Sequence, residues 1–307
     1  MTLLIVLLLA IMMSSMISAR EQRHYQKMVH ADDGEEDNEQ PDNYSSSSSF
    51  DNNYVITWGN SHVSYLYQGQ VIQLSLDIAS GAGFGSKLHY GSGLFHMRIK
   101  LPPKDSAGVV TAFYLTSSGD NHDELDFEFL GNREGKPVTL QTNVFANGVG
   151  NREQRILLWF DPTADFHTYK ILWNQHQIVF FVDETPIRVF KNKNNIGVAY
   201  PSQPMQVVAS LWNGDSWATD GGNTKINWAH APFIAWFRGF NISGCPVYDS
   251  NTMPCFISNK FWWNRERHWA LNPNEEEAYQ AVKSKYMTYD YCSDRDKHLI
   301  PPPECPQ

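Results

Sequence analysis

From about residue 51 onward, hydrophobic and polar residues alternate with a period of two over much of the chain. This pattern predicts β-strands with one buried and one solvent-facing side, and glycine, proline, asparagine or aspartate marks almost every junction. The expected strands lie within residues 62–78, 93–102, 109–118, 124–132, 139–148, 167–192 and 205–214. Strands at such regular spacing predict an all-β fold, a sandwich of two antiparallel sheets.

Two local patterns add detail to this fold. Residues 167–192 predict two successive hairpins, with turns near residues 174–175 and 183–184. One helix is expected, within residues 272–287, where Asn272 is the cap and Pro273 the first helical position. Glutamates follow in the first turn and lysines near the end, as the helix dipole favours.

The N-terminal segment differs in composition from the rest. Residues 3–13 are an apolar run too short to span a bilayer, and small residues follow up to Ser18-Ala19. This predicts a secretory signal peptide over residues 1–19, with an uncleaved anchor as the alternative because a positive n-region is missing. The acidic, serine-rich residues 20–50 predict a flexible segment, with an acidic docking arm as the alternative.

Four cysteines occupy the last fifth of the chain and agree with export. Of the three possible pairings, the simplest joins the sequence neighbours Cys245 with Cys255 and Cys292 with Cys305. The spacing lacks the CxxC pattern of a zinc site, and we expect neither a metal nor a cofactor. We therefore divide the folded part into a sandwich domain over residues 51–244 and a disulfide-bonded extension over residues 245–307.

The net charge of the chain restricts the class of binding partner, and two glycosylation sequons bear on secretion. The formal net charge is −9 at pH 7, and no run of lysine and arginine occurs. Nucleic-acid binding is disfavoured, because phosphates need a basic face. Asn43 and Asn241 each begin an N-glycosylation sequon, which fits a secreted protein.

The sequence HDELDFEFL at residues 122–130 carries the candidate chemistry. Glu124, Asp126 and Glu128 share one face of a predicted strand, and the leucine and phenylalanines between them face the core. Adjacent like charges are destabilising, and aspartate is depleted in strands. A solvated strand face is the alternative, but an unbroken acid row in a central strand favours a pair of catalytic carboxylates with a third between them.

Two carboxylates beside a groove are the apparatus of glycoside hydrolysis. The Cα atoms of Glu124 and Glu128 are expected about 13 Å apart along a strand, and this spacing does not choose between retaining and inverting chemistry. Asp126 would raise the proton affinity of one neighbour and hydrogen-bond to the other. This arrangement predicts one ionised nucleophile and one protonated acid.

Several long motifs resemble the xyloglucan endotransglucosylase/hydrolase family of plant cell walls. They lie at residues 122–132, 141–148, 151–174, 177–192 and 211–222. The likeness runs from residue 54 to residue 305 and implies a β-jelly-roll fold related to that of laminarinases and lichenases. It implies that Glu124 is the nucleophile, Asp126 the assisting acid and Glu128 the general acid/base.

The resemblance also implies a set of sugar-binding positions, some of which depart from the family pattern. Relatives commonly carry aspartate at positions 151 and 216 and often arginine at position 297. The implied substrate-binding residues are Glu128, Gln141, Thr142, Asn143, Asn151, Arg152, Glu153, Ser216, Trp217, Gly221 and Lys297.

Some of these residues have ordinary structural alternatives. Trp217 lies in a loop rich in glycine and aspartate and is a candidate sugar-stacking platform, with loop packing as the alternative. Trp159, Trp173 and Trp212 lie in apolar strands and are expected in the core. Arg152 is either a groove donor or a solvated loop charge.

The family likeness implies a secreted retaining enzyme of the cell wall or apoplast. Its partners would be xyloglucan donor and acceptor chains, with no nucleic acid and, after signal cleavage, no membrane, and we expect a monomer. Transfer is favoured over hydrolysis because no large insertion follows residue 222. The alternatives are a xyloglucan or mixed-linkage glucan hydrolase and a wall-glycan-binding protein without catalysis.

Overall fold

The computed structural model describes residues 48–305. The predicted signal peptide, Asn43 and most of the predicted flexible segment 20–50 therefore lie outside the described residues. Helix α2, Phe50–Asn53, opens the folded part, and the Phe50 side chain is completely buried. The folded region thus begins before residue 51, because the phenylalanine at the end of the serine run belongs to the core.

The described residues form an antiparallel sheet network of fifteen strands. The strands are β1 Tyr54–Trp58, β2 Val63–Leu66, β3 Val71–Leu76, β4 Ala82–Lys100, β5 Val109–Thr116, β6 Glu124–Leu130, β7 Thr139–Phe145, β8 Gln154–Leu157, β9 His167–Trp173, β10 Gln177–Val182, β11 Thr185–Lys191, β12 Met205–Asn213, β13 Phe233–Arg238, β14 Ser243–Val247 and β15 Met287–Asp290.

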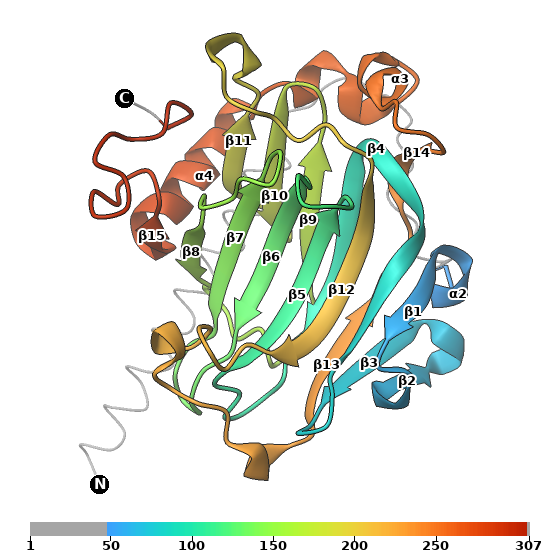
Figure 1. The fold of residues 1–307 in the computed structure, drawn as a ribbon, viewed down its shortest axis with the longest axis vertical. Helices are drawn as coiled ribbons and strands as arrows, with labels where there is room; N and C mark the ends of the chain where they lie inside the picture. The colour runs from blue at the N-terminus through green and yellow to red at the C-terminus, as the bar shows by residue number, and fades with distance from the viewer. Residues whose placement is uncertain (1–47, 306–307) are drawn as a thin grey trace, which may run out of the picture. The chain divides into compact units, whose positions relative to one another are not determined.

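Strand β4, which is 19 residues long, belongs to both layers of the fold. Its first part pairs with β1 and β12, and β5, β6, β7, β8 and β15 continue that layer in order (Figure 1). Its second part pairs with β9, which leads to β10 and β11, and with β13, which leads to β3. The predicted sandwich of two antiparallel sheets and both predicted hairpins are confirmed.

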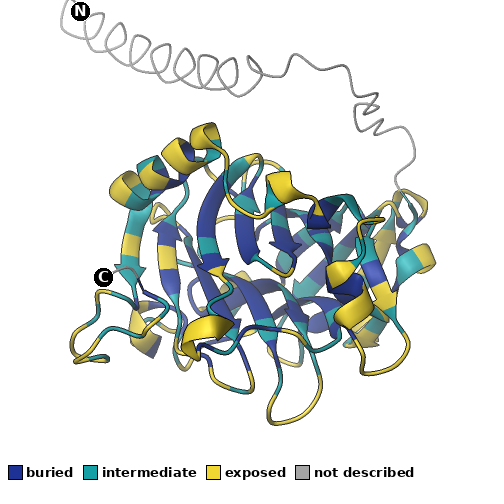
Figure 2. Cartoon of the chain, turned by 90° about the horizontal axis from the view of Figure 1, so that it is seen from above, coloured by how far each residue is buried: buried dark blue, intermediate teal, exposed yellow. Residues whose placement is uncertain are grey.

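The core lies between the two layers. Phe127 of β6 packs edge-on against Phe180 of β10, with ring centroids 5.1 Å apart, and Trp173 is fully buried as expected. Trp159 and Trp212 are only half-buried and pack against the edges of hydrophobic clusters. Figure 2 shows the buried positions gathered in the strands and the exposed ones in loops and helical turns.

Helices are few and lie outside the sheets. The predicted C-terminal helix is confirmed as α4, Pro273–Tyr286, and Asn272 forms a reciprocal capping box with Glu275. Helix α3 spans Met253–Ile257. Short 3-10 turns are found at Asn60–His62, Tyr67–Gly69, Asn194–Ile196, Asp220–Gly222, Trp228–His230, Trp262–Asn264 and Glu266–His268. Among the described residues, no helix has the length and apolar character needed to cross a membrane.

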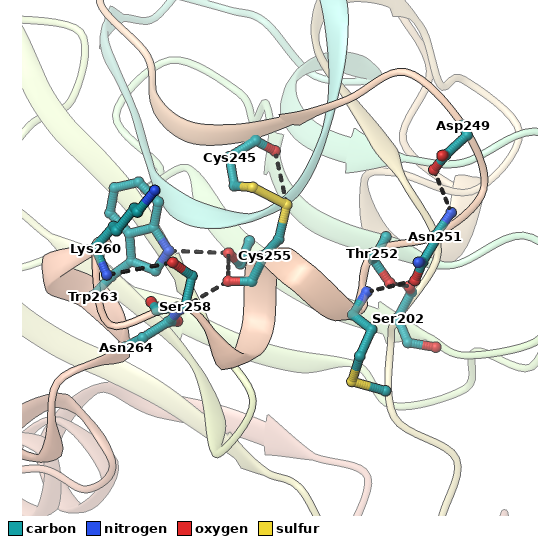
Figure 3. Close-up of a disulfide and its surroundings, with 12 residues drawn as sticks. Ser202, Cys245, Asp249, Asn251, Thr252, Cys255, Ser258, Lys260, Trp263 and Asn264 are labelled. Atoms are coloured by element: carbon teal, nitrogen blue, oxygen red, sulfur yellow. Dashed lines mark hydrogen bonds between the residues drawn. A yellow bond between two sulfur atoms is a disulfide. The ribbon is translucent and has the colours of Figure 1, made fainter.

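The C-terminal extension is joined to the sheets as well as cross-linked within itself. Cys245 pairs with Cys255 and Cys292 with Cys305, as predicted, with Cα–Cα distances of 5.6 and 5.5 Å. Strand β14 pairs with β4, and β15 pairs with β8 at the far end of the carboxylate-bearing layer. Figure 3 shows the first disulfide with the segment that it closes.

We expect Phe127→Ala to lower the free energy of unfolding by about 3–5 kcal/mol, because the missing ring leaves a cavity among Phe113, Phe129 and Phe180. Urea denaturation under non-reducing conditions measures this change. The matched control is Val55→Ala in β1, where the side chain is 43% exposed and the change should stay within about 0.5 kcal/mol. Equal losses in the two variants would contradict the placement of Phe127 at the centre of the core.

Candidate active site

Strand β6 presents its three acids on one face. Glu124 and Glu128 are half-buried and Asp126 is 6% exposed, whereas Leu125 and Phe127 face the core with no exposure. Side chains alternate along a strand, so the apolar set fixes the direction of the acidic set. The sequence prediction that the acids share a face is therefore confirmed.

Neighbouring strands surround each acid at the same level of the sheet. Glu124 lies opposite Thr116 and Phe145, Asp126 opposite Tyr114 and Asn143, and Glu128 opposite Ala112 and Gln141. Directly opposite residues in antiparallel strands project to the same face. The acids thus stand in the middle of a wide sheet face rather than at its edge.

Asp126 is the acid whose ionisation is most disfavoured. Burial raises its pKa well above the ordinary range, and the charges of Glu124 and Glu128 and a hydrogen bond with Glu124 act in the same direction. The buried guanidinium of Arg188 opposes the shift. A protonated Asp126 can donate a hydrogen bond to the Glu124 carboxylate, as expected of an assisting acid.

Glu128 also favours its protonated form. Burial raises its pKa, and nearby Glu124 and Glu153 add to the effect. The amide of Gln141 donates to Glu128 Oε2 at 2.8 Å, and Arg155 is a nearby positive charge; both lower the pKa without cancelling the shift. A carboxyl group with a raised pKa is suited to give a proton to a leaving group and to take one back.

Two further residues complete the site and were missed from the sequence. Tyr114 lies opposite Asp126, and its burial beside the acids raises its pKa to about 12, so it remains a neutral hydroxyl. The buried Asp123, which immediately precedes Glu124, accepts backbone N–H bonds from Asn147, Ser202 and Gln203 at 2.7–2.9 Å. The pairing of strands, which the sequence does not reveal, brings these groups together.

The first disulfide loop is connected to the start of β6. The hydroxyl of Thr252 donates to the Ser202 carbonyl at 2.6 Å (Figure 3), and the Ser202 amide donates to Asp123. The residue before the candidate nucleophile is therefore held by a loop that the disulfide Cys245–Cys255 closes. His122, two residues before Glu124, stacks on Phe145, with ring centroids 5.2 Å apart.

The residues predicted in β7 divide between two faces. Gln141 contacts Glu128, and Asn143 lies opposite Asp126. Thr142 lies opposite Phe127, is fully buried and accepts a hydrogen bond from Arg188 at 3.0 Å. The Thr142 side chain is therefore not on the carboxylate face, because strand alternation directs it to the core side.

Arg152 and Glu153, which are also predicted to bind sugar, form ion pairs with the C-terminal extension. Arg152 Nε lies 2.6 Å from Glu304 Oε1, and both side chains are mostly buried. Glu153 pairs with Lys297 at 2.8 Å, so two predicted sugar-binding residues bind each other. Asn151 is exposed and adopts a left-handed backbone conformation with φ of 62°. Arg152 is thus neither a free groove donor nor a solvated loop charge.

The predicted acceptor-side residues lie in the loop after β12. Ser216 and Gly221 are exposed. Trp217 is half-buried, with its ring 6.1 Å from that of Trp212. It packs against a small cluster of Val110, Leu130 and Ala218, so loop packing accounts for part of its surface while the rest stays accessible. In the part of the chain that the structure describes, no group of histidine, cysteine, aspartate and glutamate is arranged to hold a metal ion.

The chain matches two family models and several curated relatives. Residues 50–230 match the model of glycosyl hydrolases family 16, and residues 258–305 match the xyloglucan endo-transglycosylase (XET) C-terminus. Xyloglucan endotransglucosylase/hydrolase proteins 2 and 3 of Arabidopsis thaliana are 62% and 60% identical over 257 residues, which cover 83% of this chain and 88% of each relative. The chain belongs to the xyloglucan endotransglucosylase/hydrolase family.

A solved β-glucanase structure supports the same architecture. The structure of a Bacillus licheniformis β-glucanase matches 62% of this chain and 92% of its own, with 26% identity and a TM-score of 0.50. The acid-bearing strand β6 lies inside the family 16 match, and both Glu304 and Lys297 lie inside the XET C-terminus. In this member of the family, the two matched regions therefore meet at the ion pairs of Arg152 and Glu153.

We expect Asp126→Asn to raise the free energy of unfolding at pH 7 while activity falls. A raised pKa in the folded state means that stability is lost as pH rises above the unfolded value of about 3.9, and asparagine removes this loss. The gain should be present at pH 7 and small at pH 3. Urea denaturation at the two pH values measures it.

Asp183→Asn is the matched control, and we expect its effect on the free energy of unfolding at pH 7 to have the opposite sign. Bonds from His167 and the Thr168 amide outweigh burial and lower the pKa of Asp183, so its stabilisation is present above the unfolded value and lost in acid. The control should lose stability at pH 7 and little at pH 3. A destabilised Asp126→Asn protein at pH 7 would contradict the buried, protonated state of Asp126.

Proposed function

We propose that the protein is a secreted retaining enzyme that cleaves the β-1,4-glucan backbone of xyloglucan and transfers the fragment to another xyloglucan chain end. The observation that carries this proposal is the acid row of β6, in which a buried Asp126 separates Glu124 from Glu128 on one sheet face. The XET C-terminus, whose strand β15 extends that same layer, supports the choice of substrate.

In the first half-reaction, the Glu124 carboxylate attacks the anomeric carbon of the donor chain. The bond between that carbon and the glycosidic oxygen breaks, and Glu128 gives its proton to the departing oxygen. A protonated Asp126 donates a hydrogen bond to the Glu124 carboxylate and places no second negative charge beside it. The product is a covalent glycosyl-enzyme on Glu124.

In the second half-reaction, an acceptor hydroxyl attacks the same carbon and releases Glu124. Glu128, now ionised, takes the proton of that hydroxyl, which restores the starting state of both carboxyl groups. A second xyloglucan chain end as acceptor gives transfer, and water gives hydrolysis. The carboxylates act identically in both cases, so sugar binding and exclusion of water on the acceptor side decide the outcome.

Sugar binding is proposed for residues on the carboxylate face and in the loop after β12. Gln141 and Asn143 stand beside the acids, and Trp217 keeps part of its ring accessible for stacking. Glu153 and Lys297 are paired with each other, so we propose that they bind sugar hydroxyls as one unit. Ser216 and Gly221 complete the acceptor side.

We expect Glu124→Ala to lose at least about a thousandfold in both transfer and hydrolysis while keeping its unfolding midpoint, because both outcomes pass through the same glycosyl-enzyme. Release of reducing ends and incorporation of labelled xyloglucan oligosaccharide into polymer measure the two activities. The matched control is Glu134→Gln, an exposed carboxylate outside β6, which should retain wild-type rates. Unchanged turnover in Glu124→Ala would remove the catalytic assignment.

The same labelled-acceptor assay distinguishes the candidate activities. Label entering the polymer supports transfer. Reducing ends accumulating on xyloglucan without incorporation of label would point to a hydrolase, and cleavage of mixed-linkage glucan in place of xyloglucan to a glucanase. Binding of xyloglucan with no cleavage would leave a wall-glycan-binding protein.

We also propose that the protein acts as a monomer in the cell wall or apoplast after loss of the signal peptide. The two disulfides support an oxidising compartment. Asn241 begins a sequon and is exposed, which supports N-glycosylation at this position.

We expect protein secreted from plant cells to lose mass on enzymatic removal of N-glycans, and Asn241→Gln to abolish the part of this loss that arises at Asn241. Mass spectrometry of the intact chain and of the peptide that contains Asn241 measures it. An unmodified Asn241 peptide from secreted protein would exclude this site.

A further inference from the structure

A row of four side chains leads from the C-terminal extension to Glu128. Tyr289 of β15 lies opposite Arg155 of β8, Arg155 opposite Gln141 of β7, and Gln141 opposite Glu128 of β6. Directly opposite residues in antiparallel strands project to the same face. The whole row therefore lies on the face that carries the acids.

Direct contacts join the members of this row. Gln141 Nε2 donates to Glu128 Oε2 at 2.8 Å, and Arg155 Nε donates to Gln141 Oε1 at 2.8 Å. The Arg155 guanidinium stands over the Tyr289 ring, 5.5 Å from its centroid. The Tyr289 hydroxyl donates to Asp294 Oδ2 at 2.8 Å, within the segment that the disulfide Cys292–Cys305 closes.

Arg155 determines which end of the Gln141 side-chain amide faces Glu128. A glutamine side chain has an N–H end and a carbonyl end, whereas a guanidinium can only donate. Because Arg155 takes the carbonyl oxygen of Gln141, the N–H end must face Glu128. A donor in this place stabilises the ionised carboxylate, and a carbonyl turned toward it would stabilise the protonated one.

We propose that Arg155 is a positioning residue for the acid/base: it holds Gln141 in the orientation that donates to Glu128, and Tyr289 of the extension holds Arg155 in turn. This inference rests on the proposed role of Glu128. It gives the C-terminal extension a defined effect on the chemistry, which is to keep Glu128 able to ionise and so to accept a proton from the acceptor hydroxyl.

The surroundings of Glu128 make such a device necessary. Burial and the neighbouring carboxylates favour a protonated Glu128, which suits bond cleavage and opposes the second half-reaction. Gln141 and Arg155 act in the other direction. The titratable and charged groups around Glu128 are Glu124 and Asp126 on its own strand, Tyr114 on β5, Arg155 on β8, and Glu153, which immediately precedes β8.

The test is the pH dependence of transfer in Arg155→Met. With the amide free to turn and the positive charge gone, we expect the limb of kcat/KM that reports Glu128 to move to higher pH by about half to one unit, where one unit is a tenfold change in proton affinity. Labelled xyloglucan oligosaccharide and xyloglucan polymer are the substrates. Arg265→Met, an exposed arginine outside the row, should reproduce the wild-type profile.

Measuring Arg155→Met in a Gln141→Leu background separates the positioning effect of Arg155 from the direct effect of its charge. If Arg155 acts through the amide, Arg155→Met should shift the limb by less than half as much in that background as in the wild type. Equal shifts in both backgrounds, or a wild-type profile in folded Arg155→Met, would overturn the proposal. Tyr289→Leu, which removes the ring under the guanidinium, provides a second variant and should shift the limb in the same direction.

Failure of this inference is distinguishable from failure of the proposed function. A wild-type protein without transfer or hydrolysis on xyloglucan, or a fully active Glu128→Gln, rejects the function itself. Normal wild-type activity together with an inactive Glu128→Gln and an unshifted Arg155→Met rejects the positioning role alone. A lowered unfolding midpoint without a shift of the pH limb assigns Arg155 a structural role only.

Discussion

The strict alternation of side chains along β6 is the constraint on which the site depends. Leu125, Phe127 and Phe129 are locked into the core, and this leaves Glu124, Asp126 and Glu128 no other direction. A slip of one residue would bury all three acids and expose three large apolar side chains. Core packing and acid placement are therefore one property of a seven-residue strand.

Placing three acids on one strand face brings like charges close together, and the surroundings of the acids differ. Asp126 stays protonated because it is the most enclosed of the three, and this burial outweighs the opposing effect of the Arg188 charge on its pKa. Asp123 is also buried, and its side chain accepts hydrogen bonds from three backbone N–H groups.

Local patterns in the sequence predicted much of this architecture. The alternation of acids and aromatics in residues 122–130, the asparagine-proline start of α4 and the short cysteine spacings all act over a few residues, and each prediction is confirmed. The start of the folded region was placed slightly late, because Phe50 follows five serines and its core position depends on distant strands.

Contacts that depend on the order of the strands could not be predicted from the sequence. Nothing in residues 109–118 reveals that Tyr114 faces Asp126, and nothing near Arg152 reveals a partner 152 residues away in Glu304. Strand alternation alone shows that Thr142 cannot share a face with Gln141 and Asn143, but which of the two faces it takes follows from the register of β7 against β6. Such pairings are long-range, and a single sequence carries no local signal for them.

The continuity of β4 has a mechanical consequence. One uninterrupted strand runs from the acid-bearing layer into the opposite layer, so the two layers have no loop at that point about which to swing apart. The sheet face that carries the carboxylates therefore has a fixed curvature, and any adjustment to chains of different branching falls to the loops that connect the strands.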